Sequence, residues 1–199
     1  MLMFCSSPDE GNFKKLDYPS GPWRERFFRI GAAGADGRIF AYTPEDGITF
    51  VLPGVDVVKD QAGSGSVDGI TGRLVDFKYE TGSSVATALA AGLAAMIIYC
   101  VKASILAAMT ANQNKSFVGI AIPDDGANLI AEHDAMQQAF RSLGTVTTNN
   151  FIQVWEELDK VSGMLEKARG GPLAPETKRA RTENFVEFGK KLTKLAKHD

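Results

Sequence analysis

The sequence contains few of the residues that build metal centres or disulfide frameworks, and it carries almost no net charge. Its 199 residues include two cysteines and two histidines, and the formal net charge is −2. The two cysteines have no zinc-site spacing, and so small a charge gives no electrostatic reason to expect nucleic acid or an anionic membrane as a partner. We therefore expect no metal, no cofactor and no nucleic-acid partner.

The two cysteines and the N-terminal residues indicate the cellular compartment of the protein. Cys5 and Cys100 both lie in apolar runs, which is typical of buried free thiols in a reducing compartment. The apolar residues Met1–Cys5 are too few for the core of a signal peptide, and no basic segment precedes them. These features predict a cytoplasmic or otherwise intracellular protein.

Only one apolar run approaches the length of a membrane span. Val85–Val101 has 17 residues without a charge, and the apolar character resumes after Lys102 as far as Met109. A span needs about 20 predominantly apolar residues, and this run is rich in weakly apolar alanine and glycine. The pattern favours a fully buried helix in a soluble domain, so we expect no membrane partner. A membrane span remains the alternative.

The composition is that of a folded protein, with 44% hydrophobic and 23% charged residues. Apolar runs bounded by turn residues predict strands, and apolar residues at helical spacing predict helices. Strands are expected at 2–5, 27–30 and 48–52, and helices at 84–102, 130–143, 151–167 and 182–197. A segment rich in glycine and proline, 169–176, separates a domain at 1–168 from a linker and helical tail at 169–199.

Two polar segments have ordinary interpretations. Lys59–Thr71 is rich in glycine and serine, which predicts a surface hairpin or loop. Lys178–Arg181 is a basic cluster that could serve nuclear localisation or phosphate binding. Acidic residues flank it on both sides, which favours a solvated helix flank.

The start of the long apolar run has two interpretations. Ser83 and Ser84 stand just before an apolar helix, where small polar residues act as N-caps. The same position suits a nucleophile, because a helix N-terminus offers unpaired N–H groups and a positive dipole end to a developing anion. From the pattern alone, a cap and a nucleophile both remain open.

Several motifs together resemble the subtilisin-like serine peptidases (subtilases). Gly82–Gly92 reads GSSVATALAAG and resembles the family signature G-T-S-x-A-T/S-P-x-x-A-G around the nucleophile. Val51–Val55 resembles the strand-P-G segment before that serine, Arg29–Ala33 resembles an earlier strand, and Leu2–Gly11 resembles the strand and turn that carry the oxyanion-hole asparagine. The stretch through Trp155–Glu157 resembles intracellular fungal members.

The resemblance covers about Leu2 to Gly144 and implies a fold. That fold is α/β: the C-terminal half of a subtilisin-like parallel-sheet three-layer fold, followed by a helical C-terminal tail. Residues 1–168 would then be a partial peptidase domain. The implied activity is that of a serine endopeptidase with an acyl-enzyme mechanism, acting on peptide or protein substrates.

The resemblance also implies roles for single residues. Ser84 falls on the nucleophile and Ser83 on the usual threonine, while Ala88 replaces the usual proline. Asp9 falls on the oxyanion-hole position, where the family has asparagine. A carboxylate there would repel a developing oxyanion, whereas an amide donates a hydrogen bond to it. A protonated aspartate could donate, as in the related sedolisin-type acid peptidases, which are a minor alternative.

The general base of the family is missing from this chain. The family order is Asp, His, Ser, but His133 and His198 both follow Ser84, and neither has the family's flanking residues. We interpret both as solvated surface histidines. The isolated chain is therefore expected to be incomplete or inactive and to need a missing N-terminal segment or partner chain. The alternative is a non-catalytic scaffold or interaction module, a pseudoenzyme.

Two structural expectations follow from this interpretation. Ser84 should lie in the first turn of a helix of about 18 residues whose middle, Ala90–Ile97, is almost fully buried. Exposure of a broad face of that segment, or a position of Ser84 in mid-helix, would contradict both the subtilisin-like fold and the assignment of Ser84 as nucleophile. An open apolar sheet edge should lie beside Leu2–Cys5, because the neighbouring strand would come from upstream.

Overall fold

The computed structural model shows a mixed α/β protein in two compact units. It describes residues 1–11, 22–44, 46–60, 78–113, 126–144, 149–167 and 175–193. We call Met3–Ala90 with Asn149–Phe151 the sheet unit, and Met1–Leu2, Ala91–Thr148 and Ile152–Asp199 the helical unit. The α/β class predicted from the sequence is confirmed at this level.

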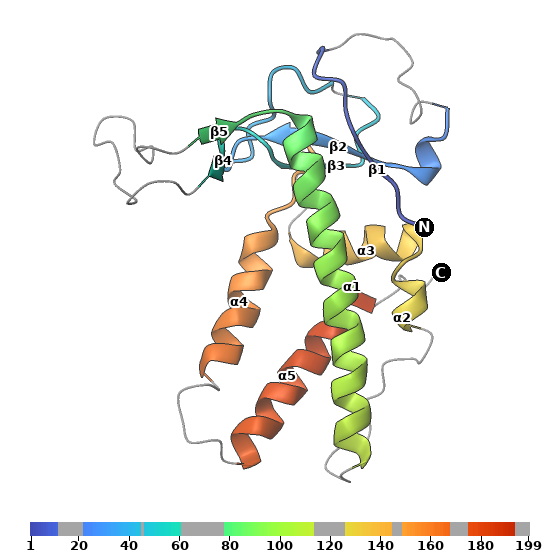
Figure 1. The fold of residues 1–199 in the computed structure, drawn as a ribbon, viewed down its shortest axis with the longest axis vertical. Coiled ribbons are helices and arrows are strands. Elements are labelled where there is room, and N and C mark those ends of the chain that lie inside the picture. Colours follow the sequence, from blue (N-terminus) through green and yellow to red (C-terminus); the bar gives the residue numbers. More distant parts are fainter. Residues whose placement is uncertain are drawn as a thin grey trace, which may run out of the picture. The chain divides into compact units, whose positions relative to one another are not determined.

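A parallel three-stranded sheet forms the core of the sheet unit. Its strands are β1 (Phe4–Ser6), β2 (Phe28–Ala33) and β3 (Phe50–Pro53), in the order β1-β2-β3 (Figure 1). Every residue of the central strand β2 is buried, as expected for a parallel strand covered on both faces. The rings of Phe4 and Phe28 stack with centroids 4.9 Å apart, and those of Phe28 and Phe50 with centroids 6.3 Å apart. The three predicted strands are confirmed, with ends shifted by a few residues.

A short antiparallel pair accompanies this sheet. It consists of β4 (Val57–Asp60) and β5 (Lys78–Glu80), and a 3₁₀ turn, η1 (Arg24–Arg26), precedes β2. The predicted loop at Lys59–Thr71 lies mostly outside the described residues.

Strand β1 lies at an edge of the parallel sheet. Among the described residues it pairs only with β2. The carbonyl of Met3 accepts from the N–H of Phe28, and the N–H of Ser7 donates to the carbonyl of Ile30. In a parallel ladder alternate residues face the partner, so the backbone groups of Phe4 point away from β2. In the described part of the chain β1 is therefore an edge strand, half-exposed at Phe4 and Cys5.

Five helices follow in the described part of the chain. Helix α1 (Ser83–Gln113) begins in the sheet unit and continues into the helical unit. The others are α2 (Gly126–Leu129), α3 (His133–Leu143), α4 (Val154–Lys167) and α5 (Pro175–Thr193). Helix α5 packs against both α3 and α4. Helix α5 begins earlier than the predicted tail helix and therefore includes the basic cluster Lys178–Arg181. Within this cluster, Arg179 forms an exposed ion pair with Glu183 at 2.9 Å. This pairing agrees with the solvated flank.

The expected full burial of the long helix is wrong. Helix α1 has 31 residues, and only one of its faces is covered in the described structure. The buried positions include Ala86, Ala90, Leu93, Ala94, Ile97, Val101, Ser104, Ile105 and Ala108. On the other face Tyr99 is 71% and Leu106 is 65% exposed. Alanine can be buried on any face of a helix, so the alanine-rich sequence does not indicate which face is covered. In the structure the buried residues are three or four positions apart and form one stripe.

The exposed face keeps the membrane alternative open. Ser83–Thr110 is long and apolar enough to cross a membrane, by length and composition, and 33% of its most apolar window is buried. The covered face is tied to α5, because the Ser104 hydroxyl donates to the Phe185 carbonyl at 3.2 Å.

The two thiols are less buried than expected. Neither Cys5 nor Cys100 forms a disulfide, and both are half-buried. Cys5 lies in an edge strand, and Cys100 lies beside the exposed face of α1. Burial nevertheless raises the pKa of the Cys100 thiol, which disfavours the reactive thiolate.

An ion pair between α4 and α5 predicts a pH dependence of stability. Glu157 accepts from Lys191 at 2.5 Å and from Lys160 at 3.0 Å, and these hydrogen bonds lower the pKa of Glu157. A lowered folded-state pKa contributes stability above the unfolded value, 4.5, and that contribution is lost as the pH falls through the folded value. We expect Glu157→Gln to cost about 0.2–1 kcal/mol at pH 7 and to flatten the dependence below pH 4.5.

Thermal unfolding between pH 3 and pH 7, a range of about four pH units around the carboxyl pKa, measures this effect. Glu166→Gln on the same helix is the matched control, because Glu166 is exposed and makes no ion pair among the described residues. An equal response of the two variants would contradict the prediction.

Candidate functional site

The candidate site lies in the sheet unit, where α1 begins. Ser84 is exposed in the first turn of the helix, and Ser83 before it is fully buried. Gly82 has φ +147°, a conformation that side chains rarely adopt, and its N–H donates to the carbonyl of Gly54 at 2.8 Å. Glycine at this position therefore fixes the helix start against the loop after β3. The expected position of Ser84 in the first turn is confirmed.

Asp9, which follows β1, holds the start of α1. Its Oδ2 accepts from the backbone N–H of Ser83 at 2.9 Å, and its Oδ1 accepts from the Ser83 hydroxyl at 2.6 Å. One of the helix's unpaired N–H groups is thereby capped by a residue 74 positions away in the chain. A carboxylate is favoured there by the positive end of the helix dipole.

Ser7 extends this contact into the core. Its buried hydroxyl donates to Ser83 Oγ at 2.8 Å, so the hydrogen bonds run from Ser7 to Ser83 to Asp9. The end of β1 and the start of α1 are thus joined by three hydrogen bonds. Sequence reasoning identified Ser83 and Asp9 but missed Ser7. Its only signal was a serine pair at the end of an apolar strand.

The Ser84 side chain is exposed to solvent. No described residue forms a hydrogen bond with its hydroxyl or its backbone N–H. That N–H can donate to an oxyanion formed at the helix start. Asp9 opposes this, because its negative charge lies beside the same N-terminus. The arrangement offers an accessible nucleophile with one oxyanion donor and a repulsive neighbour.

Neither histidine belongs to the sheet unit. His133 begins α3 in the helical unit, with Nδ1 3.2 Å from Asp134 Oδ1, and it is half-buried rather than fully solvated as expected. His198 lies outside the described residues. The sheet unit therefore holds no imidazole to take a proton from Ser84. Within the described ranges, no group of three His, Cys, Asp or Glu side chains could hold a metal ion.

Comparison with known proteins does not identify a relative of this chain. No family profile, curated protein or solved structure matches the chain. The resemblance to subtilisin-like peptidases therefore rests on the Gly82–Gly92 motif and on the order of the segments around it.

Proposed function

We propose that the chain is the nucleophile-bearing half of a subtilisin-like serine endopeptidase, inactive until another segment completes it. The observation that carries this proposal is the exposed Ser84 in the first turn of α1, next to the end of β1. Peptide or protein chains are the substrates that this activity implies.

In the proposed reaction each residue has a limited task. Ser84 Oγ attacks the peptide carbonyl after a histidine from the completing segment takes its proton, and an acyl-enzyme forms as the amine leaves. The Ser84 N–H stabilises the oxyanion. Asp9 and Ser7 hold Ser83, and therefore the helix start, in place.

One edge of the sheet unit fits half of a domain. Strand β1 pairs with β2 on one side, and no other described strand lies on its other side. We therefore propose an upstream segment carrying the family's Asp and His, on the same chain or a partner chain, as the occupant of this edge. The exposed face of α1 counts against the subtilisin-like assignment, which requires that segment to be covered.

Complementation tests this proposal. The chain is mixed with a segment carrying the D-T/S-G and H-G-T motifs, encoded upstream in frame or supplied by a subtilisin-like peptidase, and then treated with a fluorophosphonate probe. We expect one label per chain in the mixture, its loss in Ser84→Ala, and its retention in Thr110→Ala, which removes an exposed hydroxyl from the same helix. A label that survives Ser84→Ala, or no label in any mixture, would contradict the proposal.

The bonds of Asp9 also fit the second candidate, a non-catalytic scaffold. Both of its carboxylate oxygens are engaged by Ser83, which serves stability whether or not Ser84 reacts. We expect Asp9→Ala to lower the free energy of unfolding by about 0.5–2 kcal/mol, because the cap on α1 is lost.

Urea unfolding of the purified variants measures this change. Asp46→Ala is the control, since Asp46 is exposed in the same unit and makes no hydrogen bond or ion pair with a described residue. If the two variants unfold alike, the Asp9 cap contributes nothing to stability.

A further inference from the structure

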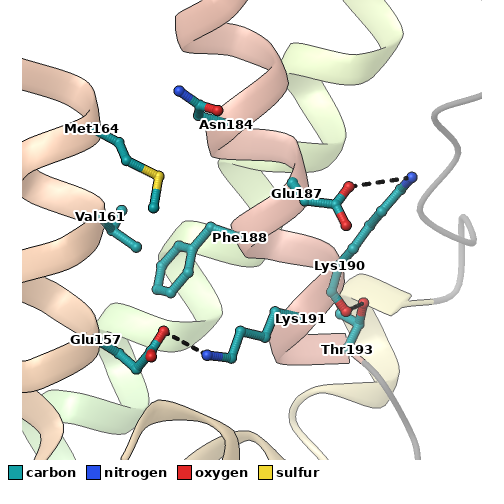
Figure 2. A pocket seen from close by; sticks show the side chains of 9 residues that line it. All are labelled: Glu157, Val161, Met164, Asn184, Glu187, Phe188, Lys190, Lys191 and Thr193. Carbon is teal, nitrogen blue, oxygen red and sulfur yellow. Dashed lines mark hydrogen bonds and ion pairs between the residues drawn. The ribbon is translucent and has the colours of Figure 1, made fainter. Parts of the chain in front are cut away.

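A cavity of about 650 Å³ lies between α4 and α5, within the helical unit. Its apolar surface comes from Val161 and Met164 on α4 and from Phe188 on α5, which face one another in Figure 2. The cavity has a size typical of small-molecule sites. Asn184 lies at one end, and the Glu157–Lys191 ion pair lies at the other (Figure 2).

The charges around the cavity are already neutralised in pairs. Lys191 lies 2.5 Å from Glu157, and Lys190 lies 3.8 Å from Glu187. With two lysines and two carboxylates, the lining carries no excess charge that would attract an anion or a cation. The lining therefore favours an uncharged ligand.

One polar side chain of the lining is uncommitted. Asn184 is exposed, and its amide makes no hydrogen bond with a described residue. The Thr193 hydroxyl, by contrast, bonds to the carbonyls of Gly189 and Lys190. An amide both donates and accepts, so Asn184 can orient a ligand that carries a single carbonyl, amide or N–H group.

We propose that this cavity is a binding site for a neutral, largely apolar small molecule with one hydrogen-bonding group. Its apolar body packs between Met164 and Phe188, and its polar group bonds to Asn184. The proposal goes beyond the peptidase activity and does not depend on Ser84.

A matched pair of fluorescent probes tests the charge preference. N-phenyl-1-naphthylamine is neutral and has one N–H, and 8-anilino-1-naphthalenesulfonate has the same ring system with a negative charge. Titrated into the full chain, the neutral probe is expected to bind about ten-fold more tightly. Equal or tighter binding of the sulfonate, or no binding of the neutral probe, would overturn the proposal.

Two substitutions locate the bound probe. Met164 is 49% exposed, so Met164→Glu should fold, and we expect it to weaken binding of the neutral probe about ten-fold. The control is Met109→Glu, because Met109 is 46% exposed on the apolar face of α1, where a hydrophobic dye could also bind. A loss with Met109→Glu instead of Met164→Glu would place the dye on α1 and reject the cavity.

Asn184→Ala provides an independent test if Met164→Glu is poorly folded. Removing one hydrogen bond should weaken the neutral probe about five-fold while leaving circular dichroism unchanged. Unchanged affinity in this variant would remove Asn184, and the orientation it gives, from the proposal.

Discussion

The isolated chain is expected to give no burst of product from an activated ester and no stoichiometric fluorophosphonate label at Ser84. Serine at its ordinary pKa is a weak nucleophile and needs an adjacent base, and the sheet unit contains no histidine. Loss of the base alone should leave at most about 10³- to 10⁴-fold acceleration over water. The repulsion from Asp9 acts within the same catalytic unit, so its penalty does not multiply with that loss.

Single-turnover hydrolysis by wild type and Ser84→Ala measures this difference. We expect the two to be indistinguishable without the completing segment. A stoichiometric label in wild type that disappears in Ser84→Ala would show that the chain does supply a base. His133→Ala would then identify it, because His133 is the histidine that the structure describes.

Gly54→Ala is expected to have the largest effect on stability. A Cβ on Gly54 would lie 2.8 Å from the Ala32 Cβ, 2.9 Å from the Ala86 Cβ and 2.9 Å from the Gly82 carbonyl oxygen. These atoms belong to the backbone or are fixed to it, so no flexible side-chain end can move away. Relieving the overlap must separate β2 from the start of α1, at a cost of about 1–3 kcal/mol or more.

Gly92→Ala makes the same chemical change where there is space. Outside the backbone of α1 itself, no atom of the described residues lies within 4 Å of a Cβ at this position, so the helix should gain about 0.5–1 kcal/mol from the higher helix propensity of alanine. Urea unfolding of wild type and the two variants measures both changes in the free energy of unfolding, the loss in Gly54→Ala and the gain in Gly92→Ala. Wild-type stability in Gly54→Ala would mean that the loop after β3 does not pack against α1 as described.

Local sequence patterns predicted where most helices and strands lie. They did not predict which faces of those elements are buried. The apolar run at β2 and the polar pair before α1 are short-range signals, and both appear where expected. The extent of α1 and its exposed face depend on which neighbours cover an alanine-rich helix, and composition does not encode this. Helix α5 began earlier than predicted because the basic cluster before its apolar face is also helical.

The site shows the same limit. Ser84 could be found from a contiguous motif, and its exposure follows from the first turn of a helix. The cap by Asp9 joins residues 74 positions apart, and no periodicity in either segment indicates it. The resemblance placed Asp9 near Ser84. That the Asp9 carboxylate binds Ser83, and that Ser7 donates to the Ser83 hydroxyl, is seen only in the structure.

The distance along the chain between Asp9 and Ser83 has a consequence for synthesis on the ribosome. Translation proceeds at about 5–20 residues per second, so Ser83 follows Asp9 by roughly 4–15 s. At the start of that interval β1 lacks its partner strand β2, and throughout it β1 lacks the helix start on which its end is fixed. The sheet strands can therefore pair on the nascent chain before α1 is made, whereas the end of β1 stays unanchored until Ser83 has been added.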